Sequence, residues 1–221
     1  MQNNAIQPLV LIGVPTLDSI KTETVASLFS ASAMIEARAK LHIHTSSLVH
    51  DARNKIVDAA RESGATHLIF IDSDMKFPPE AINKLLKEDK DIIGGLYYRK
   101  QPPHFPLVHE KDGDKIIIPR TFPKNEPFKV FGTGTGFMMI KMKVFEKIKP
   151  PWFYFGNFHG KAIGEDIYFC WKAQKAGFDV WCDPTLGLEH IGTYPFDKKD
   201  YEAYAEERPE GDVETLWEDE P

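Results

Sequence analysis

The chain of 221 residues carries a formal net charge of −6, with 42% apolar and 27% charged residues. This length fits one domain better than two, and the composition is that of an ordinary globular protein. The negative charge argues against a general nucleic-acid binder, which would carry a basic face. No apolar stretch approaches the roughly 20 residues that span a bilayer, and the start, Met1-Gln2-Asn3-Asn4, lacks the features of a signal peptide. We therefore expect a cytoplasmic protein, in which Cys170 and Cys182 are reduced, partly buried thiols.

The first half of the chain alternates strands with helices. The run His67–Ile71 is apolar without interruption, which is typical of a central parallel strand buried on both faces. The alternation predicts right-handed crossovers and a doubly wound, mostly parallel sheet flanked by helices. The expected strands are 9–14, stopped by Pro15, then 41–45, 67–71 and 91–95, and the expected helices are 20–38, 51–61 and a short one announced by Pro78-Pro79-Glu80.

The second half changes character. Residues 101–127 are rich in proline, charge and short β-prone runs, which predicts hairpins or a mobile insertion over the site. Beyond them we expect strands at 137–140, 179–182 and 186–190, and helices at 143–148 and 163–176. The predicted organisation is one catalytic domain over 1–195, with a nucleotide-binding half at about 8–100 and an acceptor and metal half at 101–195, followed by an acidic tail at 196–221 that is loosely ordered from 206.

Two carboxylates come directly after the central strand, in Asp72-Ser73-Asp74. Open parallel sheets bind ligands beyond the carboxyl ends of their strands. Mutual repulsion between Asp72 and Asp74 is relieved most simply by a divalent cation, which would in turn hold phosphate oxygens. The alternative is a polar turn in which one aspartate caps the next few residues of the chain. The placement after a buried strand favours a Mn²⁺ or Mg²⁺ site for a nucleotide.

Three further groups are candidates for the same site. His190 ends an apolar run and could offer an imidazole to Mn²⁺, although most histidines are surface or hydrogen-bonded groups. Glu165 and Asp166 open a helix, where the helix dipole is a sufficient explanation; in the functional interpretation one of them is a general base. Phosphate or ribose could be bound by Arg53 and Asn54 in the first turn of a helix and by Arg99 and Lys100 after the fourth strand.

Glycines and aromatic residues of the second half are weaker candidates. Gly134, Thr135 and Gly136 lie in a glycine-rich run that is no dinucleotide fingerprint but permits close approach to a ligand. Trp152-Phe153-Tyr154-Phe155 could form a stacking platform, and a core strand is the favoured interpretation.

Taken together, these residues resemble a GT-A glycosyltransferase, closest to the family 2 type. The resemblance spans about residues 8–192 and rests on an ordered set rather than on any single motif. The set is Val14-Pro15-Thr16, Ala52-Arg53-Asn54, Asp72-Ser73-Asp74, Gly134-Thr135-Gly136-Phe137, Gly164-Glu165-Asp166 and His190. The chain departs from the family in being short and in continuing Thr16-Leu17-Asp18 where Tyr-Asn is frequent.

The resemblance implies a role for each matched position. Pro15 and Thr16 would lie against the nucleotide base, Asp72 and Ser73 would face the donor, and Asp74 with His190 would ligate the metal. Asp166 would be the base, with Glu165 positioning a substrate. The stretch from Gly134 to Phe137, together with Trp152, would form part of the acceptor side.

The implied reaction moves a sugar from a nucleotide diphosphate sugar, a UDP-sugar by preference, to the hydroxyl of a glycan or other acceptor, with inversion and Asp166 as base. A retaining glycosyltransferase of the same fold stays open, as does a sugar-nucleotide-binding module without turnover. A nucleotidyltransferase is disfavoured, because Pro15-Thr16-Leu17-Asp18 is not a glycine-rich basic loop.

Overall fold

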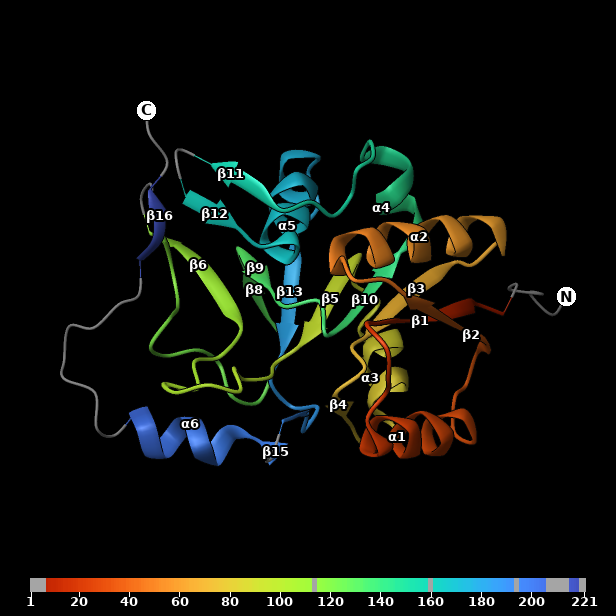
Figure 1. Ribbon diagram of the computed structural model, residues 1–221, viewed down its shortest axis with the longest axis horizontal. Helices are drawn as coiled ribbons and strands as arrows, with labels where there is room; N and C mark the ends of the chain where they lie inside the picture. The colour runs from red at the N-terminus through yellow and green to blue at the C-terminus, as the bar shows by residue number, and fades with distance from the viewer. Residues whose placement is uncertain (1–6, 113–114, 159–160, 193–194, 206–214, 219–221) are drawn as a thin grey trace, which may run out of the picture.

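The computed structural model describes residues 7–112, 115–158, 161–192, 195–205 and 215–218. A seven-stranded sheet in the order β2-β1-β3-β10-β5-β13-β8 runs through its centre (Figure 1). Five strands run in one direction, and β10 and β8 run against them, which confirms the predicted mixed α/β fold with a mostly parallel sheet. The strands are β1 (Leu9–Thr16), β2 (Arg38–Thr45), β3 (His67–Ile71), β5 (Ile92–Gly95), β8 (Phe128–Val130), β10 (Phe137–Lys141) and β13 (Val180–Asp183).

Helices cover both faces of this sheet, as its apolar strands require. Helices α2 (Val49–Glu62), α4 (Met142–Lys147) and α5 (Glu165–Lys175) lie on one face, and α1 (Thr22–Ser32) and α3 (Ala81–Glu88) on the other (Figure 1). In β3, Leu68 and Phe70 pack into the core beneath α2, whereas Ile69 and Ile71 pack into the core beneath α1 and α3. The central strand is therefore buried on both faces, as its continuous apolar run predicts.

Short strands outside the central sheet bring distant parts of the chain together. Strand β4 (Met75–Lys76) pairs with β14 (Glu189–Ile191), which also pairs with β15 (Pro195–Phe196). This pairing places residues 189–191 beside the turn after β3. The remaining elements are the hairpin β6 (Val108–Asp112) and β7 (Lys115–Ile117), the strands β9 (Gly132–Thr133) and β16 (Thr215–Glu218) beside it, the hairpin β11 (Gly156–Phe158) and β12 (Lys161–Ile163), and α6 (Lys198–Ala205).

Several predicted boundaries are wrong for local reasons. Strand β1 continues through Pro15, which faces His44 of β2 in register, because proline is tolerated near a strand end. The first helix ends at Ser32, since the chain from Arg38 onward forms β2 rather than continuing the helix. The last predicted strand is limited to Glu189–Ile191.

The aromatic run and the tail also differ from expectation. Residues 152–155 form no strand: Trp152 and Phe153 are buried in the core, while Tyr154 and Phe155 are each 49% exposed. In the tail, Thr215–Glu218 pair with β7 as strand β16 instead of lying loose. The rest of the segment expected to be loosely ordered, 206–214 and 219–221, lies outside the described residues. Within the described ranges, no helix combines the length and the apolarity needed to cross a membrane.

Candidate functional site

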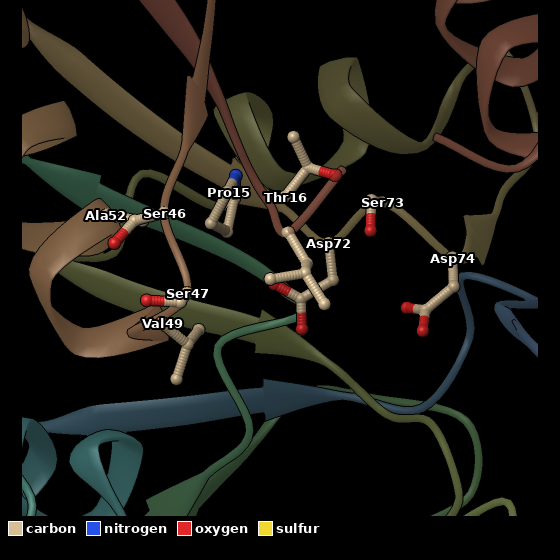
Figure 2. A pocket seen from close by; sticks show the side chains of 10 residues that line it. Pro15, Thr16, Ser46, Ser47, Val49, Ala52, Asp72, Ser73 and Asp74 are labelled. Carbon is tan, nitrogen blue, oxygen red and sulfur yellow. The ribbon is translucent and has the colours of Figure 1, made fainter. Parts of the chain in front are cut away.

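A pocket of about 230 Å³ opens at the carboxyl ends of β1 and β3. Figure 2 shows the side chains of Asp72 and Asp74 at this pocket, with Pro15 and Thr16 from the end of β1. Serines from the loop after β2 and two residues of α2 complete the wall. The lining residues are Pro15, Thr16, Leu17, Ser46, Ser47, Val49, Ala52, Asp72, Ser73 and Asp74. Predicted donor residues Pro15, Thr16, Asp72 and Ser73 therefore share one cavity.

The turn that carries the two aspartates is held by backbone hydrogen bonds on both sides. The Asp72 amide donates to the Gly136 carbonyl at 2.8 Å, and the Ile191 amide donates to the Asp74 carbonyl at 2.7 Å. The Ser73 carbonyl accepts from the Lys21 amide at 2.8 Å. Hydrogen bonds to the residues just before β10 and α1 and to β14 thus fix the backbone of the turn from which both carboxylates extend.

Asp74 lies beside His190, as the sequence predicts for the metal ligands. The Nε2 atom of His190 is 3.5 Å from Asp74 Oδ1, and its Nδ1 atom is 2.9 Å from the carbonyl of Tyr98. That carbonyl can only accept, so Nδ1 carries a proton, and Nε2 faces Asp74 with either a second proton or a lone pair. Two electron-rich atoms at this separation favour a proton or a metal ion between them.

The other carboxylate oxygen of Asp74 is bonded by the ammonium of Lys100. Burial by itself would raise the pKa of Asp74, but hydrogen bonds with His190 and Lys100 outweigh it and lower the pKa to about 2. Asp74 is therefore ionised throughout the physiological range. Lys100, predicted to neutralise a diphosphate, lies at this carboxylate.

Asp72 is neutralised from the opposite side, by Arg53 of α2. Arg53 is 3% exposed, and its Nη2 atom donates to Asp72 Oδ1 at 3.0 Å while its Nε donates to Glu165 Oε1 at 3.3 Å. Burial lowers the pKa of Arg53, but the coulombic attraction of Asp72 and Glu165 prevails and raises it. Among the described residues, Arg53 Nη1 is buried without a hydrogen-bond partner.

The repulsion between Asp72 and Asp74, which the sequence analysis expects a divalent cation to relieve, is already reduced by two side-chain cations. Arg53 pairs with Asp72, and Lys100 with Asp74. No three of the described His, Cys, Asp and Glu residues form a group that could hold a metal ion, so Asp72 does not join Asp74 and His190 in one ligand set. A sequence cannot reveal such pairings, since Arg53 approaches from another element.

We expect replacement of Arg53 by Met to lower the free energy of unfolding by about 3–5 kcal/mol, because it leaves the Glu165 carboxylate buried without its counter-charge. Urea unfolding at neutral pH measures the effect. The control is Arg61→Met on the same helix; Arg61 is exposed and lies over the Trp152 ring. Equal destabilisation by the two variants would contradict a central role for the Arg53 pairs.

Glu165 and Asp166 begin α5, and the turn at Gly164 brings them to Arg53. Asp166 Oδ1 accepts the amide of Ile167 at 2.7 Å. Burial and, to a lesser extent, the neighbouring Glu165 carboxylate raise the pKa of Asp166 to about 7, against the opposing effects of the Ile167 amide and Arg53. A carboxyl group that titrates near neutral pH is suited to proton transfer.

Tyr97 is a site residue that the sequence interpretation missed. Its hydroxyl accepts the amide of Gly136 at 2.9 Å, and burial together with the charges of Asp72 and Asp166 raises its pKa well above the usual value. A Cβ atom at Gly134 would lie 2.2 Å from this hydroxyl, and one at Gly136 would lie 2.6 Å from it. Both glycines are thus needed for close approach to Tyr97. The available signal was the position of Tyr97 directly after β5.

Two predicted binding residues belong to the scaffold instead. Asn54 donates to the carbonyls of His50 and Phe153 and accepts the amides of Trp152 and Phe153, so its side chain is committed to holding that loop. Trp152 is 3% exposed, and its indole N–H donates to Ile148 at 2.9 Å. Local hydrogen bonds occupy both side chains, and neither residue lines the pocket at Asp72 and Asp74.

The remaining predicted residues keep untested roles. Arg99 comes after β5 and donates its amide to the carbonyl of Phe105 at 3.0 Å. Thr135 is buried, and its hydroxyl has no hydrogen-bond partner among the described residues. Contact with a diphosphate for Arg99, and with an acceptor for the stretch 134–136, stay predictions.

Comparison with known proteins finds similar folds but no matching family. No protein-family model matches the chain, and no curated protein matches it. Among solved structures, A197 from STIV is 22% identical with a TM-score of 0.62, over 96% of this chain and 95% of that one. TarS 1–349 of S. aureus, solved with UDP-GlcNAc, is 14% identical with a TM-score of 0.49, over 89% and 64%. A putative glucose-1-phosphate thymidylyltransferase from Bacillus anthracis is 17% identical with a TM-score of 0.43, over 90% and 78%. The likeness to A197 shows a shared fold, which extends over nearly the whole of both chains.

Proposed function

We propose that the chain is a glycosyltransferase that moves a sugar from a UDP-sugar to an acceptor hydroxyl, with a divalent cation at Asp74 and His190. The observation that carries the proposal is the approach of His190 Nε2 to Asp74 Oδ1, at 3.5 Å, from distant parts of the sequence. These two residues lie beside the pocket formed by the end of β1 and the turn after β3. The ordered set of motifs that resembles a GT-A glycosyltransferase supports the same assignment.

The residues at this position fit Mn²⁺ or Mg²⁺. One carboxylate oxygen and one imidazole nitrogen face each other, and the bond from His190 Nδ1 to Tyr98 orients the ring as in many metal sites. When bound there, the cation would neutralise charge on the departing diphosphate. Lys100 holds the other oxygen of Asp74 and is near enough to join in that neutralisation.

The protein's own groups supply the rest of the mechanism. Asp166, with a pKa of about 7, takes the proton of the acceptor hydroxyl as that oxygen attacks the anomeric carbon. Arg53 pairs with both Asp72 and Glu165 and holds the two carboxylates in place. The donor's sugar would therefore bind against a rigid set of side chains. Attack opposite the leaving diphosphate gives inversion, and the anomeric proton signals of the product distinguish this from retention.

A screen of nucleoside diphosphates tests the proposal without knowledge of the acceptor. We expect UDP to raise the melting temperature with Mn²⁺ present and to lose most of that effect with a chelator, because a ligand stabilises the state that binds it. Release of UDP from UDP-sugars, with and without candidate acceptors, then tests turnover. A chain that no nucleoside diphosphate stabilises, with or without metal, would refute the proposal.

Lys100 should compete with the cation for Asp74. We expect Lys100→Met to tighten Mn²⁺ binding about fivefold in the absence of nucleotide, because a partly exposed pair of this kind is worth about 1 kcal/mol. The same change should weaken UDP binding once Mn²⁺ is saturating. Titration of free Mn²⁺ by electron paramagnetic resonance measures the first effect, and calorimetry measures the second.

The matched control is Lys76→Met, which removes a lysine that pairs with Glu189 at 2.7 Å on the neighbouring strand. It should leave both affinities unchanged. Weaker Mn²⁺ binding by Lys100→Met would contradict competition between the ammonium and the ion.

A further inference from the structure

A second pocket, of about 520 Å³, lies between α6 and the segment that leads into β8. It shares no lining residue with the pocket at Asp72 and Asp74. Figure 1 shows α6 along the lower edge of the molecule, apart from α2 and α4. The lining residues are Tyr98, Arg120, Thr121, Phe122, Lys124, Lys198, Tyr201 and Glu202.

Aromatic rings form the inner wall of this pocket. Tyr98 stacks on Tyr201 with ring centres 5.3 Å apart and an angle of 24° between the rings. Phe122 stacks on Phe128 with centres 5.7 Å apart and an angle of 8°. Tyr98 and Tyr201 are 3% and 8% exposed, so their stacked rings form a packed floor, whereas Phe122 is partly exposed. A partly exposed aromatic ring that is held by packing is a surface on which the C–H face of a sugar ring packs at low entropic cost.

The rim of the pocket is basic. It carries Arg120, Lys124 and Lys198 against a single carboxylate, Glu202, which leaves two positive charges in excess. Lys198 pairs with Glu202 at 3.1 Å. Arg120 and Lys124 are exposed and have no ion-pair partner among the described residues. In a chain of net charge −6, such a local excess of positive charge favours an anionic ligand.

Tyr98 connects this pocket with the candidate metal ligands. Its ring lines the pocket, while its carbonyl accepts the Nδ1 proton of His190 at 2.9 Å. His190 in turn lies 3.5 Å from Asp74. Tyr98 therefore links a ligand in this pocket to His190, one of the two residues assigned to the cation that binds the donor's diphosphate.

We propose that this second pocket binds an anionic saccharide, a sugar ring that carries a carboxylate or a phosphate, as part of the acceptor. The aromatic wall takes the sugar ring, and Arg120 with Lys124 takes the negative group. The acceptor role rests on the proposed glycosyltransferase function, whereas binding of the saccharide does not.

The test is direct binding to the full chain, by calorimetry and ligand-observed NMR. Trigalacturonic acid represents the carboxylate and glucose 6-phosphate the phosphate, with maltotriose and glucose as uncharged counterparts. We expect at least one acidic probe to bind about tenfold more tightly than its neutral counterpart and to weaken as salt rises. The preferred probe identifies the source of the charge.

The double variant Arg120→Ala with Lys124→Ala should weaken that binding about tenfold, because it removes the two cationic side chains that contact the negative group. The matched control is Lys40→Ala with Lys149→Ala, two exposed lysines outside both pockets. It should bind the acidic probe like the unmodified chain. Both double variants should keep stabilisation by UDP with Mn²⁺.

The outcomes separate this inference from the proposed function. Lack of preference for either acidic probe, or equal binding by the two double variants, overturns the inference even if UDP stabilises the chain. Specific binding of an acidic probe in a chain that binds no nucleoside diphosphate supports the saccharide site and refutes the glycosyltransferase proposal.

Discussion

Replacement of Asp74 by Ala is expected to abolish the Mn²⁺-dependent stabilisation by UDP and to lower turnover by a factor of about 10² or more. Asp74 offers the carboxylate oxygen nearest to His190 and also holds Lys100, so its loss removes an anionic ligand and frees an ammonium. Melting curves with UDP, with and without Mn²⁺, measure the first effect. Initial rates of UDP release measure the second.

Asp179→Ala is the control for this experiment. Asp179 also pairs with a lysine, Lys129, at 2.7 Å, but it is 61% exposed and does not line the donor pocket. Loss of an exposed pair of this kind costs up to about 1 kcal/mol. The control should therefore retain the response to UDP and metal. Full metal-dependent binding by Asp74→Ala would remove the cation from this position.

Asp166→Asn is expected to lower turnover by about 10² to 10⁴ while leaving UDP affinity nearly unchanged, because it removes the base without removing a donor contact. The Asn side chain keeps an oxygen that can accept the Ile167 amide. In the unmodified chain the rate should rise as pH increases toward about 7 and level off above it, since only ionised Asp166 accepts a proton.

The titration of Asp166 should also make the stability of the protein fall with rising pH, whereas the rate rises. The folded pKa of Asp166, about 7, lies above the value of about 3.9 expected when unfolded, so the folded state binds more protons between those values. Stability therefore falls as pH rises through this window. Asp166→Asn should raise the melting temperature at pH 8 more than at pH 4.

The control for both experiments is Glu23→Gln, which changes an exposed carboxylate in the first turn of α1. It should change neither turnover nor the pH dependence of melting. Undiminished transfer by Asp166→Asn would exclude it as the base. A rate that is flat between pH 5 and 8 would show that Asp166 does not titrate there.

Much of the first half of the fold could be predicted from the sequence. The apolar runs of β1, β3 and β5 and the helices between them are local patterns, and both faces of β3 are buried as expected. The place of β10 could not be read this way. Strand β10 lies antiparallel between β3 and β5, although in the sequence it follows both strands and is separated from β5 by β6 to β9. Pairing across such a separation depends on the whole sheet rather than on local periodicity.

The site residues, too, include some that the sequence could predict and some that it could not. Asp74 and His190 were predicted as neighbours, and the pairing of β4 with β14 brings them together. Asn54 and Trp152 have residue types suited to binding, yet their side-chain hydrogen bonds hold the segment 148–153 in place. Residue type shows which bonds a side chain can make, but only its neighbours decide which ones it makes.

By itself, then, the sequence determined the class of fold and the edge of the sheet where charged groups gather. A continuous apolar run predicts a buried strand, and the polar residues that follow the run lie at the carboxyl end of that strand. Only the tertiary structure decided how those charges are balanced. Arg53 meets Asp72 and Glu165, and Lys100 meets Asp74, across elements that are far apart in the chain. Electrostatic energy depends on distance in space and on burial, and neither quantity is written in the order of the residues.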